Sequence, residues 1–181
     1  MDLDDADADG VFVGQTLGGA GNFVLNGAGV VDGEWVTTDG FAKRIGFTSA
    51  GNVSAATFTV RGFVDVHRNI PITETITGPN ANTVITTNYF YVITEVSSDA
   101  AVATNVEAGN VTEASTAIQP LSWRGRTIAM DFSVTGTIDY SVEQTLDDIT
   151  VIADYPFNWQ PHSADLTNAT ADQIANYIAI P

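Results

Sequence analysis

The sequence predicts an all-β protein, built as a β-sandwich or a jelly-roll-like sandwich. β-Branched and aromatic residues recur along much of the chain with polar residues between them, as in Ala56–Phe63 and Thr83–Val96. Clusters of glycine, asparagine and proline separate these segments, which is typical of tight turns between strands. We expect about nine or ten strands and one short C-terminal helix, and so many short strands favour packed antiparallel sheets.

The N-terminal part divides into an acidic arm and a group of short strands. Residues 1–10 contain five aspartates and predict a solvated arm, which leaves residues 11–181 as a single β domain. Short apolar segments predict small strands at Val11–Val13, Phe23–Leu25 and Gly29–Val31. Two dipeptides with glycine in second place predict hairpin turns, Asn26-Gly27 and Asp32-Gly33.

The central part predicts the longest strands. Ile45–Thr48 and Ala55–Val66 are expected to pair around the turn at Ser49–Asn52, and Gly78–Asn80 is expected to end the next strand. Thr83–Val96 is expected to form one long strand. Its middle is continuously apolar, which indicates cover on both faces. The small, polar segment 100–117 is compatible with either a strand or a loop.

The C-terminal part predicts two further strands, a loop and a helix. The strands are expected at Thr127–Val134 and Thr137–Gln144, and Tyr155–Pro161 reads as an aromatic loop. Thr170–Ile178 is the helix candidate, with Thr170 as N-cap and an aspartate in the first turn.

Composition and charge disfavour several classes of function. The net charge is −16, from 22 acidic and 6 basic residues, and Lys43 is the only lysine. Phosphate groups are neutralised by clustered basic residues, so binding to nucleic acid or to anionic lipid is not expected. Cysteine is absent, and no apolar stretch has the length of a membrane span. The acidic N-terminus lacks the features of a signal peptide, so we expect synthesis in a host cytoplasm. A salt-rich habitat is an alternative cause of the charge.

Motifs for catalysis or metal binding are incomplete. Asp5–Gly10 matches the start of a calcium loop, but Thr16 stands where a bidentate glutamate is needed. His67 and His162 lie far apart in the sequence. The adjacent Asp147 and Asp148 would point to opposite faces of a strand. We therefore expect a protein without enzymatic activity, cofactor or bound metal. A glycoside hydrolase remains an alternative function, because carboxylates and aromatic side chains are both present.

Several residues are candidates for partner binding, although core packing is the default interpretation of the aromatics and ordinary surface charge is the simplest interpretation of the arginines. Loop aromatics suit a sugar ring or a protein interface, and arginines in an acidic chain suit acidic groups of a neighbouring subunit. An apolar segment next to the arm can add to a neighbour's sheet edge, and an apolar chain end calls for cover. The candidates are Val11, Phe12, Val13, Trp123, Arg124, Arg126, Tyr155, Phe157, Trp159, Ile178 and Ile180, with Trp35 as a further aromatic.

Three segments carry a resemblance to a known family. They are FTSAGNVSAATFTVRGF at 47–63, ITETITGPNANTVITTNYFYVITEVSSDAAVATNVEAG at 72–109 and GTIDYSVEQTLDD at 136–148. In this order they resemble small virion structural proteins of tailed bacteriophages. The resemblance implies a place in the virion and no catalytic residues.

Together these features lead us to expect a non-enzymatic structural protein of a tailed-phage particle. The first expectation is a decoration or cement protein, itself a homo-oligomer, that stabilises the outside of the head by binding across major capsid protein subunits. An acidic surface suits a position away from packaged DNA. The alternatives are a tail, neck or fibre-base structural protein, or a carbohydrate-binding module.

Overall fold

The protein is an all-β chain whose contacts divide it into two compact units. The computed structural model describes residues 6–116, 127–132, 139–145, 158–161, 169–171 and 173–178, and no helix occurs among them. The first unit is Met1–Ile118 and the second is Gln119–Pro181. The all-β fold class is confirmed. The sequence predicted a single domain from residue 11 onward, whereas contacts separate the chain after Ile118.

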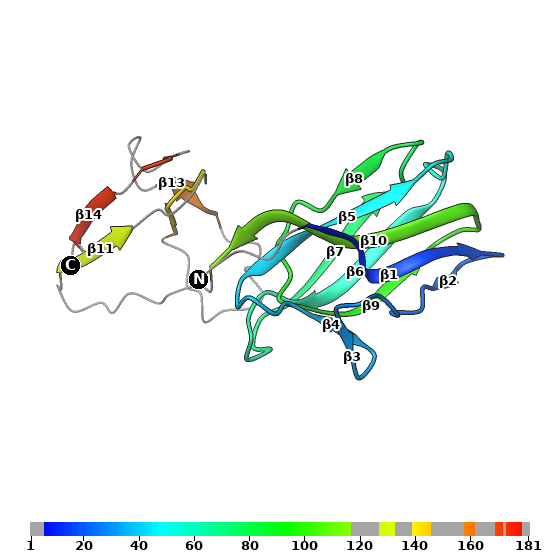
Figure 1. Ribbon diagram of the computed structural model, residues 1–181, viewed down its shortest axis with the longest axis horizontal. Coiled ribbons are helices and arrows are strands. Elements are labelled where there is room, and N and C mark those ends of the chain that lie inside the picture. Colours follow the sequence, from blue (N-terminus) through cyan, green and yellow to red (C-terminus); the bar gives the residue numbers. More distant parts are fainter. Residues whose placement is uncertain are drawn as a thin grey trace. The chain divides into compact units, whose positions relative to one another are not determined.

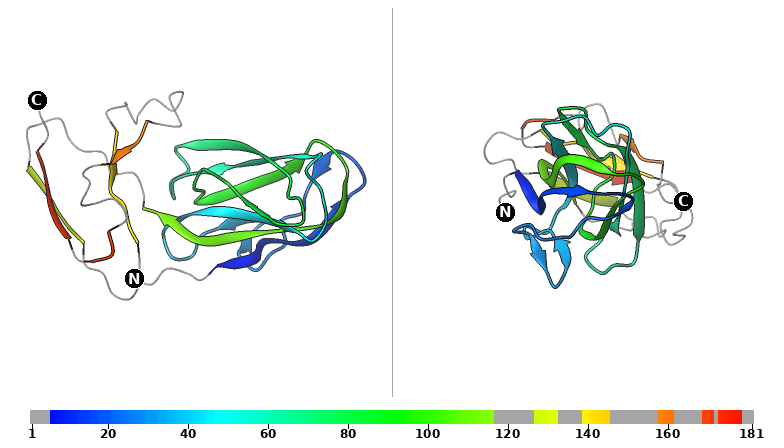
Figure 2. Two further views of the ribbon diagram at one scale, coloured as in Figure 1. Left: turned by 90° about the horizontal axis from the view of Figure 1, so that it is seen from above. Right: turned by 90° about the vertical axis from the view of Figure 1, so that its right-hand side faces the viewer.

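The first unit consists of two antiparallel sheets (Figure 1, Figure 2). The first sheet has the order β1 (Asp7–Leu17), β10 (Val102–Ser115), β5 (Ala42–Ser49) and β8 (Thr83–Ile85). The second has the order β3 (Val30–Val31), β4 (Glu34–Val36), β9 (Val92–Ser98), β6 (Thr57–Phe63) and β7 (Pro71–Thr77), and β2 (Gly21–Asn22) also pairs with β9.

This strand order is that of a jelly roll. Without the two-residue strands β2 and β3, the unit has eight strands in chain order: β1, β4, β5, β6, β7, β8, β9 and β10. The first sheet holds the first, eighth, third and sixth of these, and the second sheet holds the second, seventh, fourth and fifth. Such an order results when a long antiparallel ribbon folds into two Greek keys. Of the two sandwich types expected from the sequence, the structure has the jelly roll.

An aromatic cluster fills the space between the two sheets. Phe12 stacks on Phe23 with ring centroids 4.6 Å apart, and the rings of Phe23 and Phe58 are nearly perpendicular with centroids 5.5 Å apart. Phe47 lies 5.5 Å from Phe58 and 6.3 Å from Phe12. Fully buried aliphatic side chains surround the rings: Val11, Ile45, Val60, Ile93, Val96, Val102 and Val106. This apolar burial is the main driving force for the fold.

Two predicted strand arrangements are wrong because the chain crosses between the sheets. The segments 45–48 and 55–66 do not pair, since β5 and β6 belong to opposite sheets. The expected long strand 83–96 is interrupted, and β8 and β9 also lie in opposite sheets. Alternation along a strand reports which face is buried, but it carries no information about the neighbouring strand. The region left open at 100–117 contains β10, a strand of 14 residues.

The two predicted hairpin turns have different outcomes. At Asp32-Gly33 both residues have positive φ, 54° and 84°, and Val31 pairs with Glu34 across them, as in a tight two-residue hairpin. Asn26-Gly27 forms no hairpin. Instead, the Gly27 amide donates a hydrogen bond of 3.1 Å to the Val11 carbonyl, which places this segment along β1.

The second unit is also built from strands. β11 (Thr127–Phe132) pairs antiparallel with β14 (Gln173–Ile178), and β12 (Glu143–Gln144) pairs with β13 (Gln160–Pro161). The strand expected at 127–134 is confirmed over its described residues, 127–132. The predicted helix at 170–178 is wrong, since β14 occupies most of it. A capping residue is a local preference, and pairing with β11 along the whole of β14 outweighs it.

Candidate binding sites

The structure places two of the predicted attachment residues in the core. Val11 and Phe12 are fully buried within β1, whereas Val13 is 40% exposed. Strand β1 begins at Asp7, so Asp7–Gly10 belong to a sheet and not to the solvated arm expected over residues 1–10. The expectation that Val11 and Phe12 contact a partner is therefore corrected: their side chains are used by the jelly roll itself.

The free edge of β1 is also covered by the same chain. The Gly29 amide donates to the Gly10 carbonyl at 2.9 Å, and the Val13 amide donates to Asn26 Oδ1 at 3.1 Å. The side-chain amide of Gln15 also binds the covering segment. Its nitrogen donates to the Val24 carbonyl, and its oxygen accepts from the Val24 backbone amide. Edge backbone that is already bonded cannot receive another strand. Strand addition at this part of β1 is therefore disfavoured.

The remaining predicted contact residues belong to the second unit. Trp159 is half-buried and directly precedes β13, and Ile178 ends β14. Trp35, by contrast, is only 3% exposed and packs in the first unit. The others lie outside the described residues: Trp123, Arg124, Arg126, Tyr155, Phe157 and Ile180.

The described residues hold no group suited to a metal. In that part of the chain, no cluster of three or more histidine, cysteine, aspartate or glutamate side chains forms. Asp7 and Asp9 of the calcium-loop motif lie in β1, and His67 is exposed after β6. His162, Asp147 and Asp148 fall outside the described residues. Within the described ranges, no helix is long and apolar enough to cross a membrane.

A buried ion pair lies beside a cavity of the first unit. Lys43 Nζ is 2.5 Å from Asp39 Oδ2, and the two side chains are 1% and 3% exposed. The two charges are therefore in direct contact. Asp39 Oδ1 accepts from the Thr37 hydroxyl at 2.8 Å and from the Phe41 amide at 3.0 Å. The adjacent cavity of about 240 Å³ is lined partly by Trp35, Thr37, Lys43 and Asn110.

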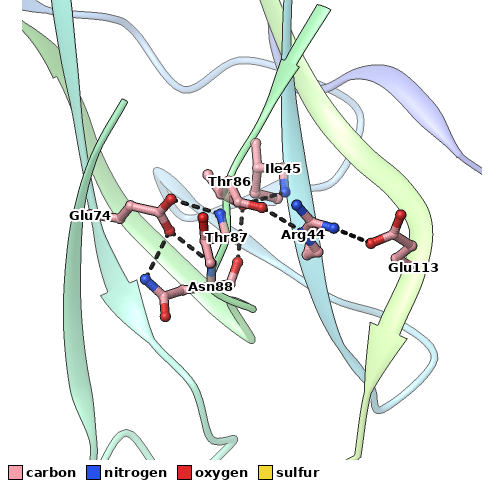
Figure 3. A network of polar contacts seen from close by, with 7 residues as sticks. All are labelled: Arg44, Ile45, Glu74, Thr86, Thr87, Asn88 and Glu113. Carbon is pink, nitrogen blue, oxygen red and sulfur yellow. Dashed lines mark hydrogen bonds and ion pairs between the residues drawn. The ribbon is translucent and has the colours of Figure 1, made fainter. Parts of the chain in front are cut away.

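A polar network fixes the connection that crosses from β8 to β9 (Figure 3). On the β7 side, the Glu74 carboxylate accepts from the Thr87 amide at 2.7 Å and from the Asn88 amide at 2.9 Å. On the β5 side, the Ile45 amide donates to the Thr86 hydroxyl at 2.9 Å. Arg44 Nε donates to the Thr86 carbonyl, and the same guanidinium pairs with Glu113. The crossing is therefore held from both sheets.

A groove of about 370 Å³ is present on the first sheet. Thr48 pairs with Glu107 on one side and with Thr83 on the other, so these three residues form a row across β10, β5 and β8. Their chain neighbours Phe47 and Ala108 are fully buried, so the row faces outward. The lining residues are Gly14, Thr48, Ser49, Ala50, Ala81, Asn82, Thr83, Asn105 and Glu107.

Sequence reasoning missed both the groove and the ion pair. The groove depends on β10, which the sequence left open between strand and loop. The polar residues Asn105 and Glu107 alternate with the buried Val106 and Ala108, and this alternation is the signal that could have been used. Asp39 and Lys43 are four residues apart, a spacing that indicates an ion pair only within a helix, and no helix was expected there.

No protein-family model, curated protein or solved structure matches the chain.

Proposed function

We propose that the chain is a non-enzymatic structural protein of a tailed-phage particle. In this proposal it is a decoration protein that stabilises the outside of the head by binding across major capsid protein subunits. The observation that carries the proposal is the jelly-roll strand order of the first unit. Viral capsid proteins and lectins use this architecture.

Charge and edge protection support an exposed position on the particle. A net charge of −16 disfavours contact with packaged DNA and suits a partner with a basic patch. The hydrogen bonds from residues 24–29 cover part of the edge of β1, and such cover limits open-ended association through that strand. Both properties suit a protein held at fixed positions on the outside of a shell.

The second unit is the better candidate for the attachment surface. Val11, Phe12 and Trp35 are buried in the first unit, and every other predicted contact residue except Val13 falls in Gln119–Pro181. We assign the anchor role to Trp159, because half-buried tryptophan side chains are frequent at the centre of protein interfaces. Arg124 and Arg126 would add pairs with acidic groups of the capsid subunits.

Reconstitution on particles that lack the protein tests this proposal. Wild-type and Trp159→Ala chains are added to such particles, which are then sedimented and assayed for retained copies. We expect the variant to lose at least about tenfold in affinity, as is usual for an interface anchor. Thr75→Ala, at an exposed position of β7, is the matched control and should bind as wild type does.

Three further measurements complete the test. Circular dichroism reports whether Trp159→Ala is folded, and Arg124→Gln with Arg126→Gln tests the same unit without removing an aromatic. Cryo-electron microscopy of the reconstituted particle locates the protein. Copies on the tail, neck or fibre base would replace the decoration role by the tail alternative, and no retained copies of the wild-type chain would refute the proposal.

A further inference from the structure

We propose that the groove on the outer face of the first sheet is a binding site for a neutral glycan. This site goes beyond the attachment role, since none of its residues is among those predicted to bind the particle. Its volume of about 370 Å³ lies within the usual range of pockets for small ligands. Every described residue that lines the groove belongs to the first unit.

Small residues create the hollow and rigid strands position its polar groups. Gly14 of β1 contributes no side chain, and Ala50 and Ala81 contribute only methyl groups. Thr48 and Glu107 project from β5 and β10, which are central strands of the sheet. The backbone of a central strand is held by neighbours on both sides, so no backbone ordering is needed when a ligand binds, which favours affinity.

The polar groups of the groove have unused hydrogen-bonding capacity. Within the described part of the chain, neither the Glu107 carboxylate nor the Asn105 side-chain amide has a protein partner. Asn82 Oδ1 accepts from the Asn80 amide at 2.7 Å, which leaves its amide hydrogens as donors. The hydroxyls of Thr48 and Thr83 are 2.8 Å apart, and only one of their two protons is needed between them.

This set of groups matches the chemistry of a sugar. Each sugar hydroxyl both donates and accepts, and the groove offers a carboxylate acceptor, two amides and a free hydroxyl proton within one small area. Hydrogen bonds to a charged acceptor are the stronger ones, which gives Glu107 the central role. Glu107 is also the only charged residue of the lining. Its charge and the net charge of −16 disfavour uronate, sulfate or phosphate groups.

Calorimetric titration of the intact chain tests the site. The probes are neutral oligosaccharides that contain glucose, galactose, mannose or N-acetylglucosamine, and a uronate-containing oligosaccharide serves as the charged comparison. We expect saturable binding of at least one neutral probe and none of the uronate probe. Glu107→Gln should weaken that binding about tenfold or more, since it removes a charged acceptor without changing shape.

Gly14→Thr is designed to fill the groove. A Cβ at this position would lie 3.5 Å from Asn105 Cβ, an ordinary contact, so the strand can accept a side chain. We expect this variant to abolish binding of the neutral probe. Thr75→Val, on the second sheet, is the matched control and should bind the probe as wild type does.

Each result decides for or against the site. No saturable binding of any neutral probe, or wild-type affinity in Glu107→Gln and Gly14→Thr, would overturn the inference. If Gly14→Thr is unfolded by circular dichroism, the isosteric Glu107→Gln still decides. The measurement uses free protein and no particles, so its outcome is independent of the attachment proposal.

Discussion

Phe12 and Phe23 stack face to face across the sandwich, with ring centroids 4.6 Å apart and ring planes 7° apart. Phe12 belongs to β1 in the first sheet. Phe23 follows β2 and is held to the second sheet by a hydrogen bond of 2.9 Å from its amide to the Val96 carbonyl. The stack therefore joins the two sheets through residues close to the N-terminus. The N-terminal strand is part of the core and not an arm added to a finished domain.

Substitution of Phe12 should show this dependence. Phe12→Ala removes a fully buried ring, and we expect a loss of about 3–5 kcal/mol in the free energy of unfolding. Val13→Ala is the matched control at the next position, where the side chain is 40% exposed, and it should cost under about 1 kcal/mol. Urea denaturation measures both values. Equal losses would contradict the placement of β1 in the core.

Gly109 of β10 is required by the close approach of β1. A Cβ on Gly109 would lie 1.7 Å from the Asp7 carbonyl oxygen, so the backbone would have to move. We expect Gly109→Ala to cost about 3 kcal/mol or to displace the start of β1. Gly14→Ala, with 3.5 Å to its nearest neighbour, should be neutral or slightly stabilising. Thermal unfolding of the two variants separates the cases, and a stable Gly109→Ala protein would argue against this register.

The buried pair of Lys43 and Asp39 predicts a non-additive effect. Lys43→Met leaves the Asp39 carboxylate buried without its counter-charge, and we expect a loss of about 3–5 kcal/mol. Adding Asp39→Asn removes the uncompensated charge and keeps an oxygen for the Thr37 and Phe41 donors. The double variant should therefore be more stable than Lys43→Met alone. A double-mutant cycle by chemical denaturation tests the sign, and strict additivity would exclude a coupled pair.

Glu74 is predicted to stabilise the connection between β8 and β9. Glu74→Gln places an amide donor where the carboxylate accepts from Thr87 and Asn88, so donors oppose each other. We expect a cost of about 1.5–3 kcal/mol and faster amide hydrogen exchange at Thr87 and Asn88.

The matched control for Glu74 is Glu95→Gln on β9. Glu95 Oε1 lies 3.6 Å from Arg61 Nε, and both side chains are substantially exposed. Such pairs contribute under about 1 kcal/mol. If both glutamine variants lose the same stability and exchange is unchanged at Thr87, the network does not hold the crossing.

Local signals predicted several of the strands and one of the two hairpin turns. The turn at Asp32-Gly33 needs positive φ at two positions, and that demand is visible in the residue types alone. Asn26-Gly27 carries the same signal without forming a hairpin, because the segment is used to cover the edge of β1. The two dipeptides therefore carry the same turn signal, and the strand that lies beside each one decides whether a hairpin forms.

The candidate sites were harder to predict than the fold. Val11 and Phe12 were expected to add to a neighbour's sheet edge, yet both are buried, and Phe12 packs against Phe47, which lies far along the chain. The groove brings together residues of β1, β5, β8 and β10 that are up to about ninety positions apart. No short motif can report such a combination.

The sequence by itself determined that this chain forms sheets, carries a strongly acidic charge and lacks cysteine chemistry. These properties follow from residue types and their local alternation. The tertiary structure alone decided the jelly-roll strand order, the core position of β1, the strand at 173–178 and the groove around Glu107. Each of these depends on which strands become neighbours. That choice is made by the burial of apolar faces over the whole molecule and not by the preferences of any one segment.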